Sequence, residues 1–134
     1  MEQTLIDKLA WIYIKDRQIL NARSKGKDIY FIPGGKREAN ESDEQALIRE
    51  IKEELSVNIA PETIKQVGAF EAQAYGKPEG TLVRMACYSA DFSGEIKPAA
   101  EIEEVAWFTS RDADKISPVS KLLFSYLKNN NLID

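Results

Sequence analysis

The sequence predicts an α/β or α+β fold in which a mixed sheet lies between helices. Three observations support this: strand-like aromatic and β-branched runs near the start, an amphipathic helical segment after Ser42, and further strand-like runs before a terminal helical segment. Strands, a helix, more strands and a last helix are typical of a sheet covered by helices. The pattern alone selects no topology.

The first third of the chain is expected to form short strands. Residues 9–14 (Leu-Ala-Trp-Ile-Tyr-Ile) predict a strand, with a turn at 15–17, a hairpin partner at 18–23 and a polar loop at 24–28. A short strand at 30–32 ends at Pro33, because proline has no N–H to give to a ladder. Gly34 and Gly35 then permit unusual backbone angles.

A helix is expected after Ser42. Ser42 and Gln45 have the spacing of a capping box, in which each side chain bonds the other residue's backbone N–H. Leu47, Ile51 and Leu55 recur every four residues and form a buried stripe, which Ile48 joins.

The second half predicts two longer strands, 65–75 and 81–92, joined by a hairpin loop at 76–80. Residues 103–108 predict another strand. Ser117 and Pro118 suit the N-cap and first position of a last helix, over 119–127.

Length and composition indicate one soluble domain over residues 1–134. A net charge of −4 makes nucleic acid and anionic membranes unexpected partners. The sequence shows no transmembrane span and no secretory signal. Its one cysteine, Cys87, is interpreted as a buried packing residue. These features favour a cytoplasmic location. Histidine is absent, which excludes histidine-dependent triads and histidine-bound zinc. The oligomeric state, monomer or homodimer, stays open.

The helix carries an unusual acidic cluster. Glu50, Glu53 and Glu54 are spaced i, i+3 and i+4, so three like charges share one face and repel one another. Acidic helical runs are commonly solvated faces. A divalent cation such as Mg²⁺, which prefers oxygen ligands and bridges carboxylates to phosphates, would offset the repulsion.

Residues 35–57 resemble the Nudix box, Gly-x5-Glu-x7-Arg-Glu-U-x-Glu-Glu-x-Gly-U, where U is aliphatic. Gly35, Glu41, Arg49 and the three glutamates all match. The preceding Phe-Ile-Pro-Gly-Gly also resembles the family's lead-in to the box. One position departs: Ser56 stands where the family has glycine. That glycine would end the helix in a left-handed conformation, which Asn58 could adopt instead.

The resemblance implies an α/β/α sandwich with the box as loop–helix–loop. It also implies a site for Mg²⁺ or Mn²⁺, with ligands Glu50, Glu53, Glu54, the Gly34 carbonyl and, from a second loop, Glu101. Glu53 is expected to be the general base, with Glu50 as the other choice. Arg49 would pair with box carboxylates, and Glu41 would brace the loop; the other reading of Arg49 is an exposed pair with Glu53.

The expected function is that of an Mg²⁺-dependent pyrophosphohydrolase, which cleaves a phosphoanhydride bond in a nucleoside diphosphate linked to another group. Nucleoside triphosphates and oxidised nucleotides belong to this class. Arg23 and Gly35 are candidate substrate-binding residues. The alternative is a Nudix-fold module that binds or senses a nucleotide without cleaving it. Retention of every box glutamate favours the enzyme.

Overall fold

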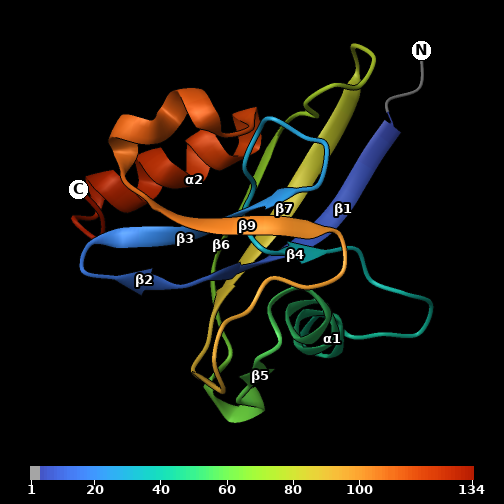
Figure 1. Ribbon diagram of the computed structural model, residues 1–134. Helices are drawn as coiled ribbons and strands as arrows, with labels where there is room; N and C mark the ends of the chain where they lie inside the picture. Colours follow the sequence, from blue (N-terminus) through green and yellow to red (C-terminus); the bar gives the residue numbers. More distant parts are fainter. Residues whose placement is uncertain (1–3) are drawn as a thin grey trace.

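The computed structural model describes residues 4–134 (Figure 1). Its main sheet has four strands in the order β4-β1-β7-β6. β1 and β7 are parallel and the other pairs antiparallel, so the expected mixed sheet is confirmed. The strand bounds are Thr4–Ile12 (β1), Gly34–Gly35 (β4), Lys65–Gln73 (β6) and Thr81–Ser89 (β7).

A second, three-stranded antiparallel sheet has the order β2-β3-β9, which the sequence did not reveal. Its strands are Ile14–Lys15 (β2), Gln18–Ser24 (β3) and Ile102–Phe108 (β9). A small pair joins Asn58–Ile59 (β5) to Phe92–Ser93 (β8). The helices are Asp43–Leu55 (α1), Pro118–Asn129 (α2) and the 3-10 segments Pro61–Thr63 (η1) and Ser110–Lys115 (η2).

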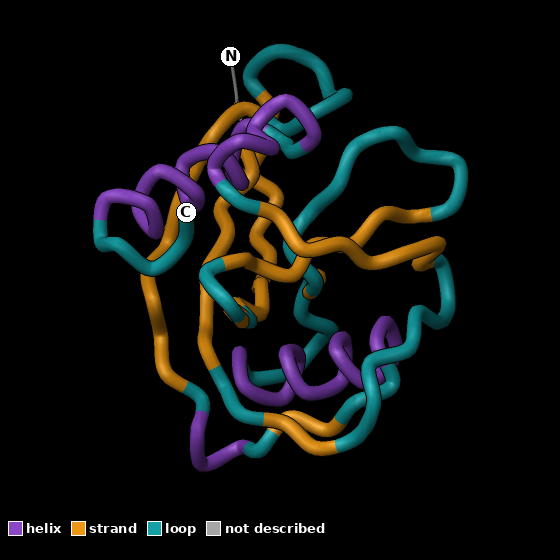
Figure 2. Tube along the Cα trace, turned by 60° about the vertical axis from the view of Figure 1, so that its left-hand side comes forward, coloured by secondary structure: helices purple, strands orange, loops and turns teal. Residues whose placement is uncertain are grey.

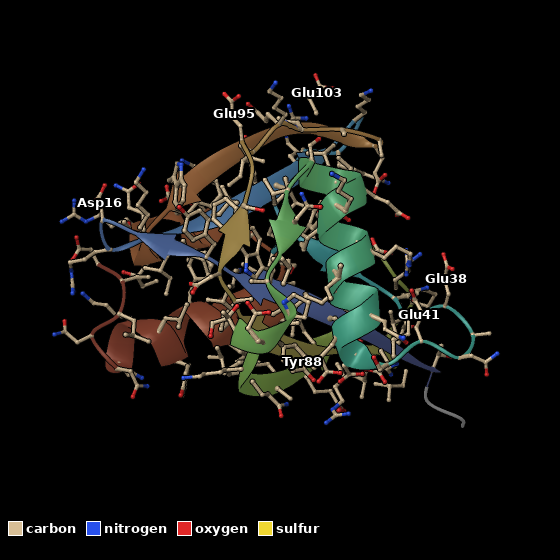
Figure 3. The ribbon with its side chains drawn as sticks, turned by 90° about the horizontal axis from the view of Figure 1, so that it is seen from below. Asp16, Glu38, Glu41, Tyr88, Glu95 and Glu103 are labelled. Carbon is tan, nitrogen blue, oxygen red and sulfur yellow. The ribbon has the colours of Figure 1, made fainter. Side chains whose placement is uncertain are left out.

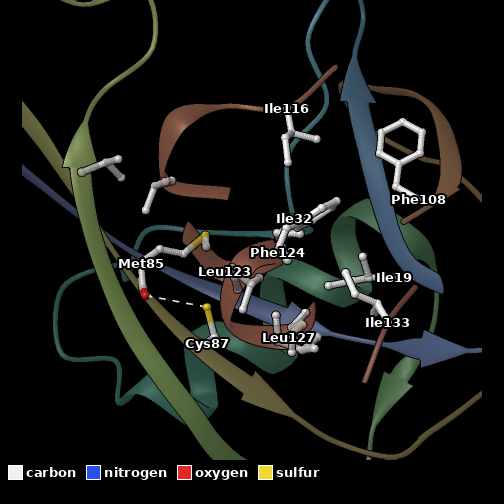
Figure 4. Packing of buried hydrophobic residues seen from close by; sticks show 14 of the residues in the cluster. Ile19, Ile32, Met85, Cys87, Phe108, Ile116, Leu123, Phe124, Leu127 and Ile133 are labelled. Carbon is white, nitrogen blue, oxygen red and sulfur yellow. Dashed lines mark hydrogen bonds between the residues drawn. The ribbon is translucent and has the colours of Figure 1, made fainter. Parts of the chain in front are cut away.

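The two α-helices lie well apart, with strands between them (Figures 1 and 2). Alternation along β1 explains this, because successive side chains of a strand point to opposite faces. Leu9 and Trp11 join a buried cluster with the apolar stripe of α1. Ala10 and Ile12 join a second cluster with Cys87 and the inner face of α2 (Figure 4).

Both predicted helices are present, and the predicted burial of Cys87 is confirmed. Burial raises the pKa of the Cys87 thiol to about 12, which leaves the thiol neutral and poorly nucleophilic. Among residues 4–134, no helix has the length and hydropathy needed to cross a membrane.

Three strand predictions are wrong in part. The predicted strand 81–92 ends at Ser89, and Phe92 belongs to β8 instead. Residues 9–14 and 18–23 do not form one long hairpin: only β2 pairs with the start of β3, whereas residues 9–12 pair with β7 and β4. The predicted strand 30–32 is reduced to two isolated bridges, and strand pairing occurs instead at Gly34–Gly35. The reason is tertiary, since the partner β7 comes from far along the chain.

Candidate active site

The N-terminal end of α1 is fixed by its cap. The Ser42 hydroxyl accepts a hydrogen bond from the Gln45 N–H at 3.2 Å, and the Gln45 side chain accepts one from the Ser42 N–H at 2.9 Å. The predicted capping box is therefore confirmed. With Leu47, Ile51 and Leu55 buried, the rotation of the helix is set, and the carboxylates turn toward β4 and the preceding loop.

Arg49 is the centre of an ionic network. Its Nε and Nη2 donate to the two oxygens of Glu41 at 2.7 and 2.9 Å, a bidentate pair. Its Nη1 donates to Glu50 at 2.9 Å and, more weakly, to Glu53 at 3.4 Å. The Arg49 bond holds the pKa of Glu41 down at about 2. The expected contacts of Arg49 are present, and the exposed pair with Glu53 alone is not the arrangement found.

Glu41 also braces the loop that precedes α1. Its carboxylate accepts a 2.7 Å hydrogen bond from the Glu38 N–H, and Arg49 donates to the Lys36 carbonyl at 3.0 Å. Figure 3 shows Glu38 and Glu41 on this loop beside the helix. The loop is therefore tied to α1 by charge-assisted hydrogen bonds at several points.

A second network anchors the same end of α1. Arg37 bonds Asp43 at 2.7 Å and also pairs with Asp7 of β1. The Tyr88 hydroxyl donates to the other oxygen of Asp43 at 2.5 Å. Sequence reasoning missed this network, because its members come from three separate parts of the chain.

Glu54 is the buried member of the acidic cluster, with 3% of its surface exposed. It accepts a 3.1 Å hydrogen bond from the Gly34 N–H. Burial, together with repulsion from Glu50 and Glu101, raises the pKa of Glu54 to about 8. Without a cation beside it, this carboxyl group is therefore mostly protonated at neutral pH.

Gly34 and Gly35 form the wall that faces these carboxylates. Gly34 has φ of 150°, and a Cβ there would clash with the Leu9 carbonyl oxygen. A Cβ on Gly35 would lie 2.6 Å from Glu50 Oε2. Glycine at both positions thus lets β4 pair with β1 and lets the Glu50 carboxylate rest against the backbone.

The donor set fits a hard divalent cation, because Glu50, Glu53 and Glu54 offer carboxylate oxygens on one side of α1 next to a bare backbone. In the described residues, however, no three acidic side chains already form an ion cage. Arg49 holds Glu50 and Glu53, so a cation would have to compete with its guanidinium.

The two outlying candidates have different surroundings. Glu101 is exposed, yet its charge contributes to the raised pKa of Glu54, which places it near the cluster. Arg23 instead pairs with Glu104 at 2.9 Å and donates to the Lys27 carbonyl at 2.8 Å. Tyr30 donates to the same Glu104 oxygen at 2.6 Å. The guanidinium of Arg23 is thus engaged across β3 and β9 and makes no bond to the carboxylates of α1.

Sequence reasoning also missed Lys8, a lysine of β1 on which Glu54 and Glu50 both act electrostatically. The signal was present, since Lys8 interrupts a face that Ile6, Ala10 and Ile12 otherwise make apolar.

Known proteins are similar to this chain over most of its length. The family model described as NUDIX domain matches residues 8–127. The chain is 30% identical over 114 residues to the CTP pyrophosphohydrolase of Escherichia coli, covering 81% of this chain and 79% of that protein. It is 26% identical over 121 residues to the ADP-ribose pyrophosphatase of Methanocaldococcus jannaschii, covering 87% and 70%.

Solved structures share the fold. The solution structure of the E. coli ORF135 protein has a TM-score of 0.71 at 26% identity, covering 94% of this chain and 92% of that one. The MutT protein from Methanosarcina mazei has a TM-score of 0.74 at 15% identity, covering 98% of both chains.

Proposed function

The chain belongs to the Nudix family and is a hydrolase of phosphoanhydrides, and from that premise we propose that it is an Mg²⁺- or Mn²⁺-dependent pyrophosphohydrolase of nucleoside diphosphate derivatives. One observation carries the proposal: Glu50 and Glu54 both lie against the backbone of Gly34 and Gly35, with Glu53 on the same side of α1. Arg49 donates hydrogen bonds to Glu50 and Glu53. Every charged position of the box is retained.

Glu50, Glu53 and Glu54, with the Gly34 carbonyl and Glu101, would hold the cation. When bound, a divalent cation neutralises phosphate charge and promotes ionisation of water. Arg49 keeps Glu50 and Glu53 in position through its bonds to both, and Glu41 fixes Arg49 in turn. These residues act by positioning and charge, which phosphoryl transfer chiefly demands.

Glu53 is the proposed general base. Its side chain is 53% exposed and its contacts with Arg49 are long, at 3.4 Å, whereas Glu50 is held at 2.9 Å and lies against Gly35. Glu53 is therefore the carboxylate most open to water. The water oxygen would form the new bond to phosphorus, its proton would pass to Glu53, and the bridging oxygen would leave with the other product.

The substrate is proposed to carry a diphosphate attached to a nucleoside. Support comes from the names of the two relatives, because CTP and ADP-ribose each contain such a linkage. The box itself would not distinguish between these substrates, since its residues would contact only the phosphates and the cation.

A hydrolysis screen tests the proposal. The panel contains the common nucleoside triphosphates, oxidised purine nucleotides, ADP-ribose and dinucleotides, each with Mg²⁺ and with Mn²⁺. We expect turnover of at least one compound, loss of turnover with EDTA, and oxygen-18 from labelled water in a phosphate-containing product. Tight binding of a nucleotide without turnover across the panel would favour the binding module instead.

A further inference from the structure

Lys8 occupies a position where the fold calls for an apolar residue. Along β1, Leu9 and Trp11 pack on the α1 side, so Lys8 shares the other face with Ala10 and Ile12. Its partner in register on β7 is Met85, which is 1% exposed and belongs to the same apolar cluster. A lysine at such a position is costly unless its charge has a use.

Within the described residues 4–134, the ammonium of Lys8 has no direct anionic partner. Among residues 4–134, Lys8 takes part in no ion pair within 4.0 Å and in no side-chain hydrogen bond. Its ammonium lies over the Phe31 ring, 5.6 Å from the ring centroid. Burial lowers the pKa of Lys8, while Glu54 and Glu50 act in the opposite direction. Lys8 therefore lies near these carboxylates but is separated from them by more than an ion-pair distance.

That separation means that no ion pair occupies the Lys8 ammonium before a ligand binds. The carboxylates of α1 would repel a polyanionic substrate, and a positive side chain on the far side of the substrate would add to the charge that a bound cation supplies. A charged group that is desolvated before binding loses less on ligand entry than a fully hydrated one. The Phe31 ring supports the ammonium from one side through a cation–π contact.

We propose that Lys8 is a substrate-binding residue whose ammonium pairs with a phosphate oxygen of the bound diphosphate, on the side opposite the carboxylates of α1. This inference rests on the proposed function. Phe31 is the positioning residue for Lys8. A lysine that served only to neutralise Glu54 would instead change the stability and cation affinity of the protein and leave substrate binding unaltered.

The test compares Lys8→Met with Lys15→Met, the same change at an exposed strand position. Binding of inorganic pyrophosphate in saturating Mg²⁺ is measured by calorimetry, and KM and kcat are measured for the best substrate of the screen. We expect Lys8→Met to weaken pyrophosphate binding and to raise KM at least tenfold, with Mg²⁺ affinity unchanged. Lys15→Met should match wild type in all of these, and Lys8→Arg should recover most of the binding.

Pyrophosphate binding and KM within twofold of wild type in Lys8→Met would overturn the inference while leaving the enzyme proposal intact. Wild-type protein that neither binds pyrophosphate nor hydrolyses any compound would overturn both. Because methionine keeps the length of the side chain and removes a desolvated charge, Lys8→Met should fold at least as stably as wild type. Loss of folding in this variant would itself assign Lys8 a structural role and contradict the inference.

Discussion

At the scale of single residues, the site resolves a conflict between like charges. Three glutamates within one turn and a half of helix repel one another. Arg49 relieves Glu50 and Glu53 on the open side, and protonation relieves Glu54 on the buried side. Without a cation, these two effects reduce the repulsion within the cluster. A bound cation would take the place of the Arg49 contacts and of the Glu54 proton, and would not enter a preformed cage.

The raised pKa of Glu54 predicts how stability depends on pH. The folded protein retains a proton that the unfolded chain releases near pH 4.5, so the stabilisation is complete below that pH and is lost as pH rises through about 8. In EDTA, we expect the Tm of wild type to fall relative to that of Glu54→Gln between pH 6 and 9. A Tm difference that does not change across this range would contradict the assignment.

The carboxylates of α1 are expected to be essential for turnover. Glu53→Gln and Glu54→Gln keep the shape of the side chain and remove its charge. Each should lower kcat by about 10²-fold or more in saturating Mg²⁺, the usual contribution of such groups. Glu62→Gln, at an exposed position of η1, is the matched control. Turnover near that of wild type in both site variants would discard the proposed site.

At the scale of elements, the ends of α1 show how local sequence fixes a helix. The capping box starts it, and Ser56 ends it with φ of 67° and ψ of 21°, the left-handed conformation in which the family has glycine. Asn58 does not take over this role, because it lies in β5. The Ser56 hydroxyl donates to the Lys97 carbonyl at 3.1 Å, which partly offsets the strain.

Ser56 gives a prediction with two arms. Ser56→Gly relieves strain of about 1–2 kcal/mol and also loses the hydroxyl bond, worth about 0.5–1.5 kcal/mol, so the net gain in stability should be at most about 1 kcal/mol. Ser56→Ala retains the strain and loses the hydroxyl bond, so it should destabilise by about 0.5–1.5 kcal/mol. Urea unfolding measures both free energies. A glycine variant less stable than the alanine variant would exclude strain at this position.

At the scale of the whole molecule, the main sheet separates two buried clusters, and the last residues connect distant elements. Asp134 pairs with Arg17 of the β2–β3 turn at 2.5 Å, and the Ser110 N–H donates to the Asp134 carbonyl at 2.7 Å. Ile133, the residue before Asp134, is fully buried in the cluster that contains Cys87 and the inner face of α2. The C-terminal segment therefore joins the second sheet to α2.

The two neighbours Ile133 and Leu132 allow a matched test of this connection. Ile133→Ala removes a fully buried side chain and should cost about 2–4 kcal/mol of unfolding free energy. Leu132→Ala removes one that is 46% exposed and should cost less than about 0.5 kcal/mol. Denaturant unfolding of both variants measures the difference. Equal losses of unfolding free energy in the two variants would mean that Ile133 does not stabilise the core.

The sequence by itself determined what depends on spacing along the chain. The start of α1, its capping box and the hairpin of β6 and β7 follow from residues close in sequence. The contacts of Arg49 with the box carboxylates were implied by the resemblance to the family. Short-range periodicity and capping chemistry specify such features without knowledge of distant partners.

Only the tertiary structure decided what depends on distant segments. The parallel pairing of β1 with β7, the second sheet and the engagement of Arg23 by Glu104 each join residues far apart in sequence. The same holds for Lys8, because folding brings Glu54, Glu50 and the Phe31 ring near its ammonium. A single sequence reports the period of a strand but not its neighbour, because strand pairing is set by long-range packing and register.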